Sequence, residues 1–215
     1  MRINSFEAIL LSIPGIIFAI VLHELAKAIV ARKMGDMGVK DRITLNPMKH
    51  IDALGAIFIA IFGFGWASPV KLSPFHYKNR KKAMMLIFAI PFIISILLGL
   101  FFLAASAFWL SYQMQLNADT FQVHLYIVQG LELAGHISIG FAFLNLLPAH
   151  PFDGFIALSA INPIAASKIA LREKFIQLII ALAIILGLFG VILQPLFDQL
   201  RIIFWNIFLG SAYTS

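Results

Sequence analysis

The sequence predicts an all-α membrane protein that crosses the bilayer several times. Of its 215 residues, 61% are hydrophobic and 12% are charged, whereas a soluble globular domain is about half apolar and about a quarter charged. The mean hydropathy is +0.94. The apolar residues gather in runs of the length needed to cross a hydrocarbon core of about 30 Å. These observations exclude an ordinary soluble domain and favour a polytopic membrane protein.

Four apolar runs are long and continuous enough to be membrane-spanning helices. We expect these spans at 5–31, 83–110, 125–147 and 175–193. The mixed stretch at 155–174 ends in basic residues and suits an interfacial helix, and the shorter apolar stretch beyond Pro195 is either a further span or a surface helix. No internal repeat or linker divides the chain. We therefore expect residues 1–215 to form one membrane domain, with a core at about 5–160 and C-terminal helices at about 161–215.

The segment between the first and second spans has two parts of different character. Residues 32–50 are polar and rich in turn formers, and within them Val39 to Leu45 is expected to form a small β element. Residues 51–70 are apolar but interrupted by three glycines and a proline. A membrane-spanning helix would be less interrupted. We therefore expect a re-entrant segment that dips into the membrane and is shielded by protein.

The charged residues predict an orientation in the membrane. The formal net charge is +6, but the basic residues lie in short loops between apolar runs, which favours a topology signal over nucleic-acid binding. Of the 16 Lys and Arg residues, 13 lie in the loops at 32–50, 71–82 and 148–174. The positive-inside rule makes these loops cytoplasmic and the N-terminus external. The chain has no cysteine, which excludes disulfides and thiolate metal ligands.

The first predicted span carries His23 and Glu24 side by side near its inner end. Ionisable residues at membrane depth cost a few kcal/mol each on insertion scales, and they usually mark a functional site. In the pattern H-E-x-x-H, two histidines one helical turn apart bind zinc, and the glutamate is the base for a zinc-bound water. Here the fifth position is Lys27 instead of histidine. The segment therefore offers one zinc ligand and one base, with a cation where the second ligand is expected.

A second motif lies at the end of the third predicted span, where the chain reads N-L-L-P-A-H-P-F-D-G. The charge argument places it at the same membrane level as His23. Together the two motifs resemble the site-2 protease family of intramembrane zinc metalloproteases, which pairs H-E-x-x-H with N-x-x-P-x-x-P-x-D-G. The resemblance covers roughly residues 10–160. Every fixed position of the second motif is matched, by Asn145, Pro148, Pro151, Asp153 and Gly154.

The resemblance implies a fold, a reaction and a role for each motif. The fold is a helical site-2 protease-like core with a small β element and a re-entrant segment. His23 and Asp153 would bind one zinc ion per chain, and Glu24 would be the general base. The loop from Asn145 to Gly154 would present the aspartate and receive an unwound substrate. That substrate would be a transmembrane segment of another membrane protein, hydrolysed near the cytoplasmic face.

The chain departs from the family pattern at two places. A lysine ammonium has no lone pair for a metal and repels a divalent cation, so Lys27 is a poor replacement for the second histidine. The family's A-G-P-x-x-N appears as A-I-P-F-I-I, so that Ile90 and Ile94 replace a glycine and an asparagine. We expect these changes to remove a close-approach point and a polar side chain near the site. Both departures favour a weakened or abandoned active site.

Three interpretations of Lys27 remain open from the sequence. In the first, zinc still binds and His150 supplies the missing ligand. In the second, no catalytic zinc is bound, and the Lys27 ammonium neutralises Glu24 or Asp153, whose carboxylates would otherwise be unpaired in a low-dielectric site. In the third, the lysine is a substitution that silences an otherwise active protease.

The sequence accordingly supports an intramembrane zinc metalloprotease as the biochemical class, in which Lys27 puts activity in question. One alternative is a pseudoprotease that binds membrane-protein segments without cleaving them. Another is a small transporter or proton-relay protein, which would use the ionisable residues of the spans. Transporters often contain paired repeats with broken helices at corresponding positions, and the sequence contains none. The ionisable residues in question are Glu24, Lys27, Glu132, His136 and Asp153.

Overall fold

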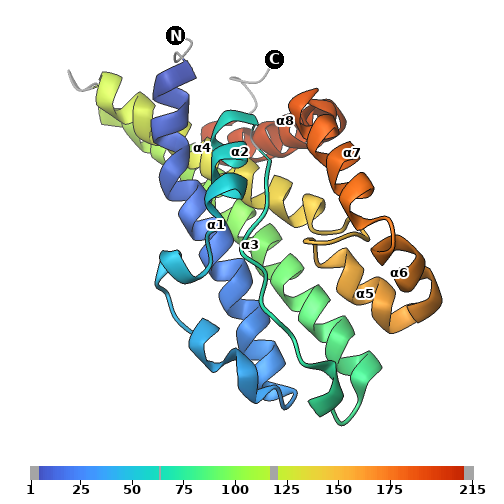
Figure 1. Cartoon of the computed structure of the whole chain (residues 1–215). Coiled ribbons are helices and arrows are strands. Elements are labelled where there is room, and N and C mark those ends of the chain that lie inside the picture. The colour runs from blue at the N-terminus through green and yellow to red at the C-terminus, as the bar shows by residue number, and fades with distance from the viewer. Residues whose placement is uncertain (1–4, 63, 117–120, 211–215) are drawn as a thin grey trace.

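The computed structural model describes residues 5–62, 64–116 and 121–210, and nearly all of its regular structure is α-helical. Long helices form one packed group, and shorter helices flank it (Figure 1). The α-helices are α1 (Ser5–Lys33), α2 (Ala53–Phe62), α3 (Arg80–Leu116), α4 (Phe121–Leu144), α5 (Gly154–Ile161), α6 (Pro163–Ala170), α7 (Glu173–Ile185) and α8 (Leu188–Leu209). Three short 3-10 helices lie in the loops: η1 (Met37–Arg42), η2 (Pro47–Lys49) and η3 (Pro74–His76).

The central packing unit consists of α1, α3 and α4, each of which contacts the other two. Small residues allow α3 and α4 to approach closely, as is common between membrane helices. A Cβ atom on Gly99 would lie 2.9 Å from the carbonyl oxygen of Gly135, and one on Gly135 would lie 3.1 Å from that of Gly99. This close packing keeps His23, Glu24 and Lys27 of α1 away from the surface.

Four of the described helices are long and apolar enough to cross a membrane, namely α1, α3, α4 and α8. The first three match the predicted spans, and the chain is accordingly an integral membrane protein by composition. The predicted fourth span at 175–193 is wrong. Gly187 has a left-handed φ of 71° and separates α7 from α8, a conformation that commonly ends helices. With 13 residues, α7 is about 20 Å long and too short to cross the bilayer, so α8 is the fourth candidate.

The loop after α1 contains no β element within its described residues, contrary to the prediction. Residues 39–45 lie in η1 and the turn that follows it. Two side chains cap the backbone and favour tight turns over strands. The Asp36 carboxylate accepts from the Gly38 amide at 3.0 Å, and Asn46 accepts from the Met48 amide at 3.0 Å.

Residues 51–70 form the short helix α2 followed by an extended return. The Ser68 amide donates to the carbonyl of His50 at 2.8 Å, which brings the two ends of the segment together. Glycine is required where the two arms touch, because a Cβ on Gly55 would lie 2.0 Å from the carbonyl oxygen of Trp66. With 10 residues, α2 is about 15 Å long, so the segment turns back instead of crossing. Its depth in a bilayer remains a prediction.

Candidate active site

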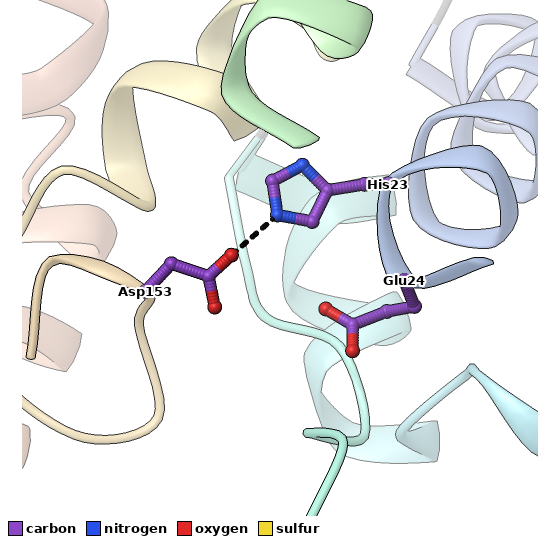
Figure 2. A group of neighbouring side chains, drawn as sticks. All are labelled: His23, Glu24 and Asp153. Carbon is purple, nitrogen blue, oxygen red and sulfur yellow. Dashed lines mark hydrogen bonds and ion pairs between the residues drawn. The ribbon is translucent and has the colours of Figure 1, made fainter. Parts of the chain in front are cut away.

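The ionisable residues of α1 meet Asp153, which lies at the start of α5. His23, Glu24 and Lys27 project from one side of α1, and all four residues are 2% exposed or less. Figure 2 shows His23 and Glu24 pointing from α1 toward Asp153, which comes from the loop on the opposite side. The fold thus brings together two motifs that lie 130 residues apart in the chain.

Three of these side chains are of the types that bind zinc. Suitable atoms of His23, Glu24 and Asp153 all lie within 4.8 Å of one another. Among the described residues, no other group of three or more histidine and acidic side chains has this geometry. One imidazole and two carboxylates are an acceptable donor set for zinc, although catalytic sites usually contain two histidines.

Lys27 occupies the space among these donors. Its Nζ atom lies 2.6 Å from Asp153 Oδ1 and also donates to Glu24 Oε1. An ammonium group has three N–H donors and no lone pair, so it takes the place of a cation and cannot be a ligand. The residues present therefore do not fit a zinc ion while Lys27 is charged and bound in this way.

The hydrogen bonds of His23 lead to the same conclusion. Its Nε2 lies 2.8 Å from Asp153 Oδ2 and its Nδ1 lies 2.8 Å from Ser95 Oγ. An ionised carboxylate can only accept, so Nε2 carries the proton in this bond, and in a neutral ring Nδ1 then accepts from the serine hydroxyl. The ring nitrogen nearest Asp153 is therefore protonated and has no lone pair for a metal.

The charges of the site are balanced by protein groups. Two carboxylates, Glu24 and Asp153, face the Lys27 ammonium, and the Arg42 guanidinium lies 3.9 Å from Glu24 Oε2. Burial alone would raise the pKa of Asp153, but the Lys27 charge and the His23 hydrogen bond outweigh it and hold that pKa below its ordinary value. Arg42 is itself held by the carbonyl of Ser68 on the extended return after α2.

The loop after α4 places Asp153 through Asn145 and Gly154. The Asn145 side chain donates to the carbonyl of Phe141 at 2.9 Å and accepts from the Asp153 amide at 3.4 Å. The Gly154 amide donates to the Asn145 carbonyl at 2.7 Å. A Cβ on Gly154 would lie 2.2 Å from the carbonyl oxygen of Leu146, so only glycine fits there.

Two curated proteins are similar to this chain over most of its length. "Putative zinc metalloprotease YwhC" of Bacillus subtilis is 29% identical over 189 residues, which cover 86% of this chain and 85% of that protein. "Putative zinc metalloprotease Rip2" of Mycolicibacterium smegmatis is 27% identical over 184 residues, which cover 82% and 67%. These relatives confirm the resemblance to the site-2 protease family. No family model matches the chain, and no solved structure matches it significantly.

His150, the residue considered as a substitute zinc ligand, does not join the cluster of His23, Glu24 and Asp153. His150 is exposed, and its ring centroid lies 4.1 Å from that of Phe155. It is not part of the group formed by His23, Glu24 and Asp153. The interpretation in which His150 completes a zinc site therefore has no support in this arrangement.

The altered segment of α3 also differs from what we expected. Ile90 and Ile94 line a groove on the outer side of α1 and α3, together with Leu22 and Ala26, and do not line the cavity beside Asp153. The polar contact from α3 to the site comes instead from Ser95, which is completely buried. Sequence reasoning missed this residue, although a serine within the apolar run after Pro91 was a signal that could have identified it.

The remaining ionisable residues of the spans lie elsewhere. Glu132 and His136 are on α4 and face α8, where Arg201 contributes to the electrostatic environment of both. The His136 ring stacks on Phe197 with 4.6 Å between centroids. The five residues considered for a proton relay therefore belong to two separate groups.

A cavity of about 320 Å³ gives access to the cluster. Lys27 and Asp153 form part of its wall, and the other walls come from the extended return after α2, the start of α3, the loop residues His150 to Phe152 and helix α5. Apolar side chains such as Val70, Met84 and Ile156 dominate the lining, while Lys71 and Arg80 are its exposed basic members. The cavity therefore has a mainly apolar lining next to the charged cluster.

Proposed function

We propose that this chain has the architecture of a site-2 protease in which the Lys27 ammonium takes the place of the metal, and that it binds transmembrane segments of other membrane proteins without hydrolysing them. The observation that carries the proposal is the hydrogen bonding of one buried ammonium to both Glu24 and Asp153. The zinc metalloprotease names of the two relatives support the protease ancestry of the site.

Peptide hydrolysis by a metalloprotease needs a zinc ion, a free glutamate base and a histidine lone pair that binds the zinc. The contacts of Lys27 and His23 oppose all three. A bound zinc ion would polarise the scissile carbonyl and lower the pKa of its bound water to about 7. Here the Lys27 ammonium lies among the atoms that would bind that ion. It also donates to Glu24 Oε1, so this oxygen is not free to accept a proton from water. His23 presents an N–H group instead of a lone pair. The same arrangement leaves the adjoining cavity available for binding.

An active zinc metalloprotease is the second candidate. It is favoured by the compact set of donors on His23, Glu24 and Asp153 and by the names of the relatives. It would require Lys27 to lose its proton or to swing out of the cluster. We propose that the active centre faces the cytoplasm in either case, following the distribution of basic residues.

Metal content separates the two candidates. Elemental analysis of the purified protein should find no stoichiometric zinc in the unmodified chain and about one zinc per chain in Lys27→His, where a second imidazole replaces the ammonium. Asp153→Ala in the Lys27→His background should lose that zinc. Lys49→His, which adds a histidine at an exposed position, is the matched control and should bind none. Stoichiometric zinc in the unmodified chain that disappears in Asp153→Ala would favour the active protease.

Binding without hydrolysis is tested by photo-crosslinking in membranes. A benzoyl-phenylalanine at Phe155, beside the cavity, should form adducts that the same group at Phe108, on the exposed side of α3, does not form. The crosslinked partner should have its full length when the chain that carries the crosslinker retains Lys27. Shortened partners with the unmodified chain, or identical adducts from both positions, would contradict the proposal.

A further inference from the structure

A second cavity, of about 370 Å³, lies where α1 ends and α3 begins. Its lining includes Lys33, Lys78, Lys82 and His76. We propose that it binds the phosphate group of an anionic phospholipid, one acyl chain of which lies in the adjoining groove between α1 and α3. The site is separate from the cluster around Asp153 and does not depend on the function proposed for that cluster.

The charge of this cavity favours an anion. Three lysines line it, and no Asp or Glu is among its lining residues. None of the three lysines takes part in an ion pair with another described residue. The neighbouring carboxylate of Asp36 is fully buried and already engaged, since it accepts from the Ser73 amide at 2.7 Å and from the Tyr77 hydroxyl at 3.2 Å. The lysine charges are therefore free for a ligand.

The position of the cavity favours a lipid headgroup. It lies at the ends of two candidate membrane spans, α1 and α3, which lie side by side in Figure 1. Lysines at this level keep their ammonium groups among the headgroups while their stems lie against apolar surface. Each basic residue close to an anionic membrane surface also contributes favourably to lipid binding.

An apolar groove continues from this cavity along the helices. The groove has a volume of about 370 Å³ and shares Lys33 and Met34 with the basic cavity. Its remaining lining is entirely apolar and comes from both helices, with Leu25 and Ile29 on α1 and Ile90 on α3 among its members. A basic cavity joined to an apolar groove matches a phospholipid, with a charged head and a hydrocarbon tail, better than it matches a free inorganic anion.

The walls of the basic cavity are fixed by the backbone around it. Gly35 has a φ of 112° and turns the chain out of α1, and a Cβ there would lie 3.1 Å from the carbonyl oxygen of His76. The Asn79 side chain accepts from the Lys82 amide at 3.0 Å and caps the start of α3. The lysines thus project from a defined turn and a capped helix.

The test is a titration of the full chain in detergent with phosphatidylglycerol, followed by native mass spectrometry. The variant Lys33→Gln/Lys78→Gln/Lys82→Gln should weaken phosphatidylglycerol binding on the order of tenfold or more, and leave the weak binding of phosphatidylcholine unchanged. The matched control, Lys40→Gln/Lys49→Gln/Lys81→Gln, removes the same charge from exposed positions outside the cavity and should change binding less than about threefold. Equal weakening by the two triple variants would overturn the proposal, because it would indicate diffuse attraction.

A second variant tests the lipid tail. Ile94→Trp fills the groove without changing charge and should weaken phosphatidylglycerol binding while leaving the lysines in place. Inorganic phosphate is the probe for the other source of the same chemical group. Competition by phosphate only at high concentration, together with an effect of Ile94→Trp, supports the lipid. Phosphate that binds as tightly as phosphatidylglycerol, with no effect of Ile94→Trp, would overturn it in favour of a free-anion site.

Discussion

Removal of the Lys27 ammonium should be far more costly than removal of a lysine from the surface. The ammonium is hydrogen-bonded to Glu24 and Asp153, and none of the three side chains is more than 3% exposed. In Lys27→Met, a side chain of similar length replaces it without charge. The carboxylates of Glu24 and Asp153 then remain buried without this cation. The Arg42 guanidinium lies 3.9 Å from Glu24 Oε2 and can compensate the charge of Glu24 alone. Among the described residues, the Asp153 carboxylate would retain only its hydrogen bond from His23.

The expected magnitude follows from this imbalance. Breaking a buried ion pair by removing one partner costs about 3–5 kcal/mol, because the other charge is left without compensation. Lys27→Met/Asp153→Asn removes a carboxylate together with its cation. The double variant should therefore be more stable than Lys27→Met alone, with a coupling free energy of about 1–3 kcal/mol. Lys49→Met, at an exposed position, should change stability by less than about 0.5 kcal/mol.

The measurement is equilibrium unfolding in mixed micelles of a mild and a denaturing detergent, followed by circular dichroism. Lys27→Met, Asp153→Asn, the double variant, Lys49→Met and the unmodified chain are compared under one set of conditions. If Lys27→Met proves as stable as the unmodified chain, the ammonium is not paired as the structure indicates. Additive effects of Lys27→Met and Asp153→Asn would also contradict this pairing, since they would show that the two charges do not interact.

Three further predictions concern the loop that places Asp153, the serine bonded to His23 and the buried pair of Tyr77 and Asp36. Gly154→Ala should prevent the loop from closing and lower the unfolding midpoint sharply, whereas Gly190→Ala, where an added Cβ would meet nothing within 4 Å, should be neutral or slightly stabilising. Ser95→Ala removes the partner of His23 Nδ1 and should cost about 1 kcal/mol; in a zinc-binding Lys27→His background it should weaken zinc affinity by about 10–100-fold, measured by chelator competition. Tyr77→Phe removes a hydroxyl bonded to a buried carboxylate and should cost about 1 kcal/mol of unfolding free energy.

The burial of Tyr77 also makes a prediction about pH. Burial and the adjacent Asp36 carboxylate raise the pKa of Tyr77 above its ordinary value. The unfolded chain would lose the tyrosine proton near its ordinary pKa of about 10, while the folded chain retains it. The neutral Tyr77 hydroxyl therefore contributes its full stabilisation below about pH 10, and the free energy of unfolding should fall as the pH rises above about 10. In Tyr77→Phe this loss should be smaller, which unfolding midpoints measured across that range can show.

Much of the site could be predicted from the sequence because its parts are motifs of fixed spacing. Positions 23, 24 and 27 lie within one turn of a helix, and the second motif ends in a loop at the same membrane level. The contact between Lys27 and the two carboxylates follows from helical spacing and from the cost of burying unpaired charge. The interpretation in which this ammonium neutralises Glu24 or Asp153 agrees with the observed contacts.

Other parts depend on tertiary packing that a single sequence does not reveal. Ser95 reaches His23 only because α3 packs against α1 at that height, and Arg42 reaches Glu24 across a loop without regular periodicity. The fourth span was misplaced because hydropathy continues across Gly187, where the backbone turns. The strand expected at 39–45 does not form. The side chains of Asp36 and Asn46 accept hydrogen bonds from nearby backbone amides and favour turns.

The proposed function requires the Lys27 ammonium to lie where a metalloprotease would hold its metal. The most direct measurement is an experimental structure of the unmodified chain prepared with added zinc, with anomalous diffraction recorded at the zinc edge. We expect density for Lys27 Nζ between Glu24 and Asp153 and no anomalous peak at that position. An anomalous peak about 2.0–2.1 Å from His23 Nε2, with Asp153 as a ligand and Lys27 displaced, would contradict it.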